Sequence, residues 1–267
     1  MMPYFNINYK FTPSFWNQFS KQEHYFKGSI LLEEQKLSGY LDFLKNINFN
    51  EGLLLKTDLY VEAKNKNDNF LPYLKINRCV GMDISFEIVK MARENLRDFF
   101  PAMKFVVADI RHLPFKEGSF NAVISDSTLD HSPRNALVNT LIETKRIIKN
   151  KGKIIVALNN IFNPLSIYDS SVKNFFTNDY FISFCYRPRY ILTLLKNLGF
   201  STMHWDYIIS VDSLGALLVK LSRKVKGIDS LARQWLSVVM QLSKLPFLKM
   251  FFCLQFIILA DKAGEEN

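Results

Sequence analysis

The sequence predicts an α/β protein in which a parallel sheet carries helices packed against it. Two short apolar runs, 79–82 and 105–108, have the character of buried strands, and each is followed directly by an aspartate, Asp83 and Asp109. Between them, apolar side chains recur three and four positions apart, as in a helix with one face on a sheet. Because the carboxyl ends of parallel strands face the crevice where ligands bind, both aspartates are expected to hold a polar ligand.

The two aspartates point first to a nucleoside-containing ligand. A carboxylate accepts two hydrogen bonds from a ribose diol, and a second one nearby can help to orient the base. The alternative is structural, because aspartate suits turns and helix starts, and Asp83 stands two residues before Ser85, a suitable N-cap.

Length and composition favour a single domain with an elaborated end. The chain has 267 residues, and its apolar content of 48 % supplies a large core. The net charge of +9 would suit contact with a polyanion such as nucleic acid or anionic lipid. We favour the simpler interpretation of a generally basic surface, because lysines are spread along the whole chain.

The cysteines and histidines give no sign of a metal centre or a disulfide framework. The three cysteines and four histidines lie far apart, and the cysteines stand in apolar stretches. The first residues lack the continuous apolar core of a secretory signal, and the apolar run 245–260 is interrupted by Pro246, Lys249 and Gln255. These features predict a soluble, cytoplasmic protein with buried thiols and no metal.

Glycine spacing argues against the common diphosphate-binding loops. No two of the ten glycines lie closer than 11 residues apart, so neither GxGxxG nor GxxxxGK(S/T) occurs. A diphosphate needs backbone amides brought close by glycine at a helix start. NAD, FAD and ATP bound in these ways are therefore disfavoured, and a cofactor without phosphate is expected.

The alternation of strands and helices continues along the chain. Residues 52–58 have the pattern of a buried strand that again ends in an acid, Asp58. Glu62 follows four residues later in a helical stretch, so that the carboxylates of Asp58 and Glu62 would face one mouth. The other expected elements are helices at 29–46, 86–99, 133–148, 188–197 and 230–242, and strands at 105–109, 120–125, 153–158 and from 199 onward.

Four motifs stand in order along this alternation, namely GMDIS, VVADIRHLPF, GSFNAVIS and ETKRIIKNKGKIIVALNN. In this order they resemble the class I S-adenosylmethionine-dependent methyltransferases, in particular the broad group that acts on small molecules. The resemblance covers residues 52–160, and FIILADK near the carboxyl end resembles that family's last strand. It implies a Rossmann-like, seven-stranded, mostly parallel sheet with helices on both faces, and S-adenosylmethionine as cofactor.

The resemblance also assigns roles to residues at the strand tips. In the family the acid after the second strand holds the ribose hydroxyls, which corresponds to Asp83, and the acid after the third strand lies by the adenine, which corresponds to Asp109. The fourth strand tip borders the methyl group and the acceptor, which corresponds to Ser125 and Asp126. The residues expected to bind the cofactor are Asp58, Glu62, Asp83, Ile84, Asp109, Ile110, Ser125 and Asp126.

One departure from the family pattern concerns its glycine-rich first motif. That motif brings the backbone close to the methionine part of the cofactor, whereas residues 57–63 read TDLYVEA and contain no glycine. The acid is kept as Asp58, and the LKTDL and EA arrangement is similar to that of a subset of the family. Glu62 would then take over a contact, for instance with the methionine amino group. The alternative is a methyltransferase-like binding domain that has lost the cofactor, because side chains at 60–62 would crowd the site.

The expected acceptor side carries one candidate base and a dense aromatic segment. Transfer from an activated sulfonium needs mainly alignment with the acceptor and shielding from water. Where the acceptor is a hydroxyl, His131 is the best-placed catalytic base, and a structural or capping role is its alternative. Seven aromatic residues between 175 and 190 would suit a lid over an apolar acceptor or ordinary packing.

The expected partners follow from charge and from a missing motif. Residues 220–226 (KLSRKVK) and the amphipathic stretch after them would suit anionic lipid or an acidic carrier, and a solvated face is the alternative. Methylation of nucleic-acid bases is disfavoured, because SDSTLDHSP after the fourth strand lacks the (D/N/S)PP(Y/F/W) motif that holds a flipped base. A small-molecule acceptor is expected, and it could be apolar or carrier-bound.

These expectations divide the chain into three parts of one structural domain. Residues 1–51 would form an N-terminal helical cover, residues 52–160 the cofactor-binding core, and residues 161–267 an acceptor-side insertion that completes the sheet.

Overall fold

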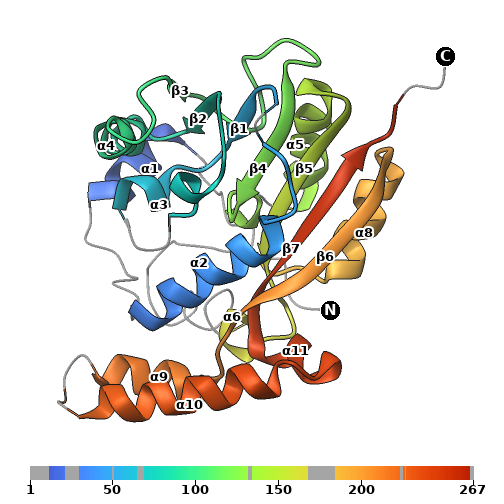
Figure 1. The fold of residues 1–267 in the computed structure, drawn as a ribbon. Coiled ribbons are helices and arrows are strands. Elements are labelled where there is room, and N and C mark those ends of the chain that lie inside the picture. Colours follow the sequence, from blue (N-terminus) through green and yellow to red (C-terminus); the bar gives the residue numbers. More distant parts are fainter. Residues whose placement is uncertain are drawn as a thin grey trace.

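The computed structural model describes residues 12–21, 30–49, 51–64, 69–131, 134–167, 184–222, 225 and 227–264, and a seven-stranded sheet lies at its centre. The strand order is β3-β2-β1-β4-β5-β7-β6, in which β7 runs antiparallel to β5 and β6 while the other neighbours are parallel (Figure 1). The predicted fold class is therefore confirmed. The strands are β1 (Leu54–Lys56), β2 (Cys79–Asp83), β3 (Lys104–Val107), β4 (Phe120–Asp126), β5 (Ile148–Asn159), β6 (Phe200–Ser210) and β7 (Cys253–Lys262).

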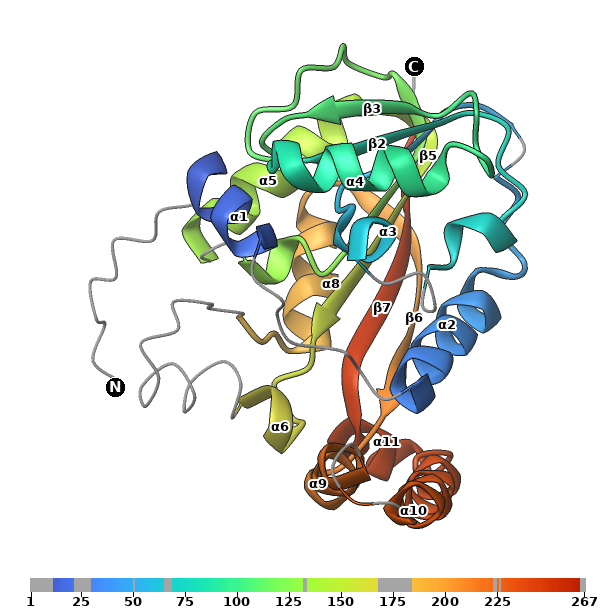
Figure 2. The same cartoon turned by 90° about the vertical axis from the view of Figure 1, so that its left-hand side faces the viewer.

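Helices cover both faces of this sheet and bury two apolar layers. Consecutive residues of β1 point to opposite faces, so that Leu54 and Leu55 belong to different apolar clusters. The Leu54 cluster includes buried side chains of α2 (Ile30–Leu44) and α4 (Phe86–Leu96), whereas the Leu55 cluster includes those of α5 (Arg134–Ile147) and α8 (Pro188–Asn197). Figures 1 and 2 show these two layers, with α1 (Pro13–Lys21) beside α4.

Two predicted strand boundaries are wrong. β1 ends at Lys56, so Asp58 lies in the loop that follows the strand, although the Thr57 amide still donates to the carbonyl of Ile124. β5 begins at Ile148, although 149–152 was expected to end the preceding helix. The pairing register of β5 against β4 shifts within this stretch, and Lys151 adopts a positive φ of 61°. Such an irregularity accommodates extra residues within a strand.

Three helices are inserted between β6 and β7. They are α9 (Ser213–Ser222), α10 (Ile228–Leu242) and α11 (Pro246–Phe252), of which only α10 was predicted. Because β6 runs in the same direction as β1 to β5, the insertion starts at the edge of the sheet where those strands end. It forms the lower end of the molecule in Figure 1. Among the helices of the described ranges, none has the length and apolar content needed to cross a bilayer.

Two buried asparagines after β5 attach this insertion to the sheet. The amide nitrogen of Asn160 donates to the carbonyls of Met250 and Cys253 at 2.7 and 2.8 Å. The amide nitrogen of Asn163 donates to the carbonyl of Val211 at 3.1 Å. Both asparagine side chains are fully buried, so the end of β5 is joined to both ends of the inserted helices.

Candidate functional site

Asp83, at the end of β2, is fixed by two backbone amides. Its Oδ2 accepts a hydrogen bond from the amide of Leu59 at 3.1 Å, and its Oδ1 accepts one from the amide of Ser85 at 2.8 Å. The Ser85 hydroxyl accepts from the amide of Ile88 at 3.3 Å and caps α4. The capping role thus belongs to Ser85, while the half-buried Asp83 carboxylate is held at the strand tip with acceptor capacity left over.

Asp58 lies beside Asp83 and raises its pKa. The Asp58 Oδ1 accepts a hydrogen bond from the amide of Tyr60 at 2.7 Å, which orients the half-buried side chain. Burial and, next, the charge of Asp58 raise the pKa of Asp83 to about 7. A ligand that donates hydrogen bonds or carries positive charge would relieve this repulsion.

The segment that replaces the glycine-rich motif turns its side chains inward. It forms α3 (Tyr60–Lys64), in which Val61 and Glu62 are buried while Tyr60 is partly exposed. The Glu62 carboxylate lies 3.8 Å from the Lys56 ammonium and accepts no hydrogen bond from any described residue. Of residues 60–62, Tyr60 is thus the one whose side chain reaches the surface.

Lys56 and Glu62 form a fully buried ion pair beneath the strand tips. Burial raises the pKa of Glu62 to about 7, although the charge of Lys56 opposes this shift. Burial lowers the pKa of Lys56, but the charges of Glu62 and Asp58 outweigh it and raise that pKa overall. The Lys56 ammonium also donates to the Asp58 carbonyl at 2.5 Å and lies 5.7 Å from the ring centre of Phe70.

Helix α2 contributes two further polar side chains that the sequence analysis missed. The Lys36 ammonium lies 3.1 Å from Asp126 Oδ2, and the Tyr40 hydroxyl donates to Asp126 Oδ1. Burial alone would raise the pKa of Asp126, but Lys36 and Lys56 lower it overall, so this carboxylate stays ionised. We call Lys36, Tyr40, Lys56, Glu62 and Asp126 the buried charge cluster. Two features of the sequence could have indicated this cluster. Lys56 ends an apolar run, and Lys36 and Tyr40 stand four residues apart in a predicted helix.

Asp109 is engaged by a neighbouring arginine. Arg111 Nε donates to both carboxylate oxygens at 2.9 Å, and the Arg111 amide donates to Oδ1 at the same distance. Burial opposes ionisation, but the hydrogen bonds and charge of Arg111 lower the pKa of Asp109 overall. Ile110 is buried beside it, and Ile84 is half-buried next to Asp83.

Helix α1 contacts residues that follow β2 and residues that follow β4. The Asn17 side-chain oxygen accepts from the Ser85 hydroxyl at 2.8 Å and from the Glu87 amide at 3.4 Å. The ring of Trp16, the residue directly before Asn17, lies 5.1 Å from that of His131, which is partly exposed beyond the β4 tip. His131, the predicted base, therefore lies beyond the β4 tip and in contact with α1.

Two more buried polar groups lie near the β4 tip. Ser125 Oγ and Asp130 Oδ2 form no hydrogen bond with any described residue, whereas Asp130 Oδ1 accepts from the amide of Asn159 at 3.0 Å. Burial raises the pKa of Asp130 well above its usual range, and the charges of Asp126 and Asp58 act in the same direction. Buried polar groups of this kind are uncommon in folded proteins and mark places where a ligand or water completes the hydrogen bonding.

The carboxylates at this edge outnumber the cations. The strand tips and the buried charge cluster bring five carboxyl groups close enough to influence one another, together with two lysines. The carboxyl groups are those of Asp58, Glu62, Asp83, Asp126 and Asp130, and the lysines are Lys36 and Lys56. Because the pKa values of Glu62, Asp83 and Asp130 are raised, these groups hold protons near neutral pH that a positively charged ligand, or one rich in hydrogen-bond donors, would replace.

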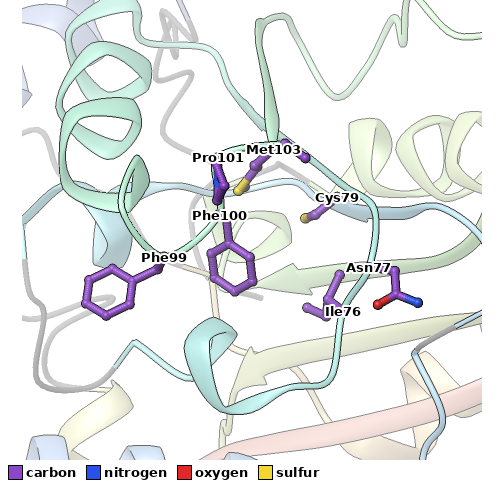
Figure 3. A pocket seen from close by; sticks show the side chains of 8 residues that line it. Ile76, Asn77, Cys79, Phe99, Phe100, Pro101 and Met103 are labelled. Carbon is purple, nitrogen blue, oxygen red and sulfur yellow. The ribbon is translucent and has the colours of Figure 1, made fainter.

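A cavity at the other edge of the sheet lacks such groups. It has a volume of about 190 Å³ and lies at the amino end of β2, where apolar side chains surround it (Figure 3). The buried Cys79 thiol lines it, and burial raises the pKa of this thiol to about 12, so it is not a reactive thiolate. The lining residues are Ile76, Asn77, Cys79, Phe99, Phe100, Pro101, Ala102 and Met103.

The aromatic segment expected to form a lid falls mostly outside the described residues. Phe175, Phe176, Tyr180 and Phe181 are not described. Of the remaining three, Tyr186 is fully buried in the cluster with α5 and α8, and Tyr190 is exposed on α8.

Comparison with known sequences finds one matching family and three relatives. Residues 67–156 match the family described as Methyltransferase domain. The uncharacterized protein MJ0638 of Methanocaldococcus jannaschii is 34 % identical over 106 residues, which cover 36 % of this chain and 43 % of that protein. The chain thus spans less than half the length of this relative.

Comparison with solved structures shows the same fold. A chain in the complex between the Haloferax volcanii Trm112 methyltransferase activator and the putative methyltransferase has a TM-score of 0.61 at 16 % identity, covering 95 % of this chain and 97 % of that one. An S-adenosylmethionine-dependent methyltransferase of Thermotoga maritima, a possible histamine N-methyltransferase, has a TM-score of 0.57 at 15 % identity, covering 94 % and 97 %.

Proposed function

We propose that this chain, which carries a class I S-adenosylmethionine-dependent methyltransferase domain, transfers a methyl group to a small-molecule acceptor. One observation supports this most strongly. The Asp83 carboxylate stands half-buried at the end of β2, held by two backbone amides and repelled by Asp58. Such a carboxylate is stabilised when it accepts hydrogen bonds from the two hydroxyls of a ribose.

The residues at this edge fit S-adenosylmethionine, the cofactor that the family implies. Asp83 would accept hydrogen bonds from the ribose hydroxyls with Ile84 beside the cofactor, and Asp109 with Ile110 would border the adenine. The surplus of carboxylates suits a ligand that carries a sulfonium and an ammonium group. Because Val61 and Glu62 point into the core, the loss of glycine leaves Tyr60 as the main bulk near the cofactor. The bound cofactor supplies a methyl group already activated for transfer.

The acceptor side is assigned to the β4 tip. His131 would accept the proton of a hydroxyl acceptor, and Ser125 Oγ is a buried polar group available for hydrogen bonding there. Helix α1, with Trp16 against His131, would shield the reacting groups from water. A screen of cell extracts for transfer of a labelled methyl group would identify the acceptor class, and a protein or nucleic-acid product would contradict a small-molecule acceptor.

Replacement of Asp83 by asparagine tests the cofactor site. We expect affinity for S-adenosylmethionine and for its demethylated product to fall roughly 10- to 100-fold, because hydrogen bonds to a charged acceptor are lost. Isothermal titration calorimetry measures the change. The control is Asp98→Asn, whose side chain is 86 % exposed and which should bind like the wild type. Wild-type affinity in Asp83→Asn would remove Asp83 from the site, and no binding by the wild-type chain would indicate a domain that has lost the cofactor.

The same site predicts a dependence of cofactor affinity on pH. The pKa of Asp83 is raised to about 7, so its carboxyl group is mostly protonated at pH 6 and mostly ionised at pH 8. The ionised form is the stronger acceptor, and affinity should rise by up to about tenfold over this interval. Calorimetry at the two pH values checks this. The Asp83→Asn variant should lack the increase, and an equal increase in that variant would assign the effect to another group.

A further inference from the structure

The inserted helices expose an unusual amount of apolar surface. Nineteen large apolar side chains are exposed in the described part of the chain, and eleven of them lie within 214–251. The most exposed is Phe247 of α11, at 66 %, followed by Leu231 of α10 at 52 % and Leu217 of α9 at 50 %. A concentration of this kind on one small part of a surface marks an interaction site.

Helix α10 carries two apolar rows, of which only one is used for packing. Ala232, Leu236 and Val239 are buried, and the first two belong to one apolar cluster with Val219 of α9. A second apolar row has the same helical spacing but begins one residue earlier along the chain. It therefore lies on a different face of the helix. This outer row consists of Leu231, Trp235, Val238 and Leu242, of which Trp235 is partly buried and the other three are exposed.

The neighbouring helices carry exposed apolar side chains of their own. On α9, exposed leucines recur at Leu214, Leu217 and Leu221, the spacing of a single helix face. The Trp235 indole donates to Asp212 at 2.9 Å, just before α9, and so connects the two helices. On α11, Phe247 and Phe251 are exposed one turn apart, and no residue of that helix is buried.

The inserted segment 213–252, helices and connections together, also holds most of the net positive charge. Residues 213–252 contain seven lysines and arginines and one acid, a net charge of +6 out of +9 for the whole chain. The single acid, Asp229, is already paired with Arg233 at 2.9 Å. Basic residues in the same segment as exposed Leu and Phe side chains are the combination found on helices that lie in the headgroup region of a bilayer.

We propose that helices α9, α10 and α11 form a docking surface for an anionic membrane. The exposed apolar rows would enter the boundary between headgroups and acyl chains, while the lysines and arginines bind anionic headgroups. The charge favours lipid over a second copy of the chain, because two copies would bring two such positive surfaces together. The sequence analysis preferred a solvated face for 220–226, and the exposed rows of all three helices now favour contact with lipid.

Docking in this way would bring the cofactor-binding edge near the bilayer. The insertion begins where β6 ends, at the same edge of the sheet as Asp83 and the β4 tip. Figures 1 and 2 show α9 and α10 side by side at this end of the molecule, away from α5. An acceptor that dissolves in or collects at the membrane would then be close to the site.

Vesicle flotation with the full chain tests this proposal. Vesicles of phosphatidylcholine with about 30 mol % phosphatidylglycerol should bind at least about tenfold more protein than phosphatidylcholine alone, and about 0.5 M NaCl should remove most of the difference. Equal binding to both vesicle types, or to neither, would overturn the proposal. So would a dimer, measured by light scattering, that forms through the same residues and is unaffected by vesicles.

Paired variants separate the docking surface from the fold. Phe247→Ser with Phe251→Ser should reduce vesicle binding at least about tenfold, and Leu231→Gln with Val238→Gln should do the same from another helix. The matched control is Phe99→Ser, which removes a side chain that is also 66 % exposed but lies after α4, and it should bind vesicles normally. All variants should keep the affinity for the demethylated cofactor, so failure of the membrane proposal and failure of the proposed function are distinguishable.

Discussion

Replacement of Lys56 by methionine is expected to lower the free energy of unfolding by about 1 to 2 kcal/mol at pH 8. The methionine keeps most of the volume of the lysine stem but leaves the buried Glu62 carboxylate without its cation. Glu62 has no hydrogen bond from any described residue to compensate for this loss. Urea unfolding of the wild type and the variant measures the change.

The size of this loss should depend on pH in a definite direction. The folded state keeps a proton on Glu62 up to its raised pKa of about 7, while the unfolded chain releases it near 4.5. The stability linked to this carboxyl is therefore complete below pH 4.5 and decreases as pH rises to 7. Without Lys56 the pKa of Glu62 rises further and the decrease extends to higher pH. The variant should differ little from the wild type at pH 5 and most at pH 8.

Two further variants identify the cause. Adding Glu62→Gln to Lys56→Met should recover most of the lost stability at pH 8, because no buried charge is left unpaired. Lys64→Met, at an exposed lysine of the same short helix, should unfold like the wild type. A loss for Lys56→Met of the same size at pH 5 and pH 8 would show that packing, and not the ion pair, is responsible.

Replacement of Asn160 by alanine is expected to cost about 2 to 4 kcal/mol of unfolding free energy. Two carbonyls, those of Met250 and Cys253, lose their donor, and the Phe162 amide loses its acceptor at 3.1 Å. The Asn160 side chain is fully buried, so water cannot replace these hydrogen bonds without entering the core. Thermal and urea unfolding measure the loss, with the exposed Asn150→Ala as the control that should be neutral.

The loss at Asn160 should be concentrated in the inserted helices. Native-state hydrogen exchange should become faster in α11 and the first residues of β7, because the Asn160 side chain donates to carbonyls of these two elements. The amides of α4 and β2 should keep their protection. Uniformly faster exchange over the whole sheet would instead indicate that Asn160 stabilises the fold as a unit.

The local patterns of the sequence predicted the fold well. The runs that end at Asp83 and Asp126 proved to be neighbours of β1, because buried parallel strands leave a continuous apolar signature that needs no knowledge of the partners. The boundaries of β1 and β5 could not be obtained in this way. They depend on the pairing with β4, and pairing is set by contacts across the sheet.

Local sequence patterns could not predict the buried charge cluster. Tyr40 and Asp126 are 86 residues apart, and nothing in either segment specifies the other. Glu62 was expected to face the ligand mouth, but the side chain turns toward Lys56, a strand residue with no recognised role in the sequence analysis. Whether Glu62 and Asp126 touch the cofactor remains a prediction for binding measurements on variants.

The reversed direction of β7 has a consequence for how such proteins can diversify. Because the chain leaves the sheet after β6 and returns through β7, everything between these strands is an appendage whose two ends lie side by side. Its length and chemistry can change without moving β1, β2 or β4, provided that the side-chain amides of Asn160 and Asn163 can each still donate to two backbone carbonyls of the segment and its ends. A transplanted segment could then give the protein another interaction surface while the strand tips that carry Asp83 and Asp126 stay in place.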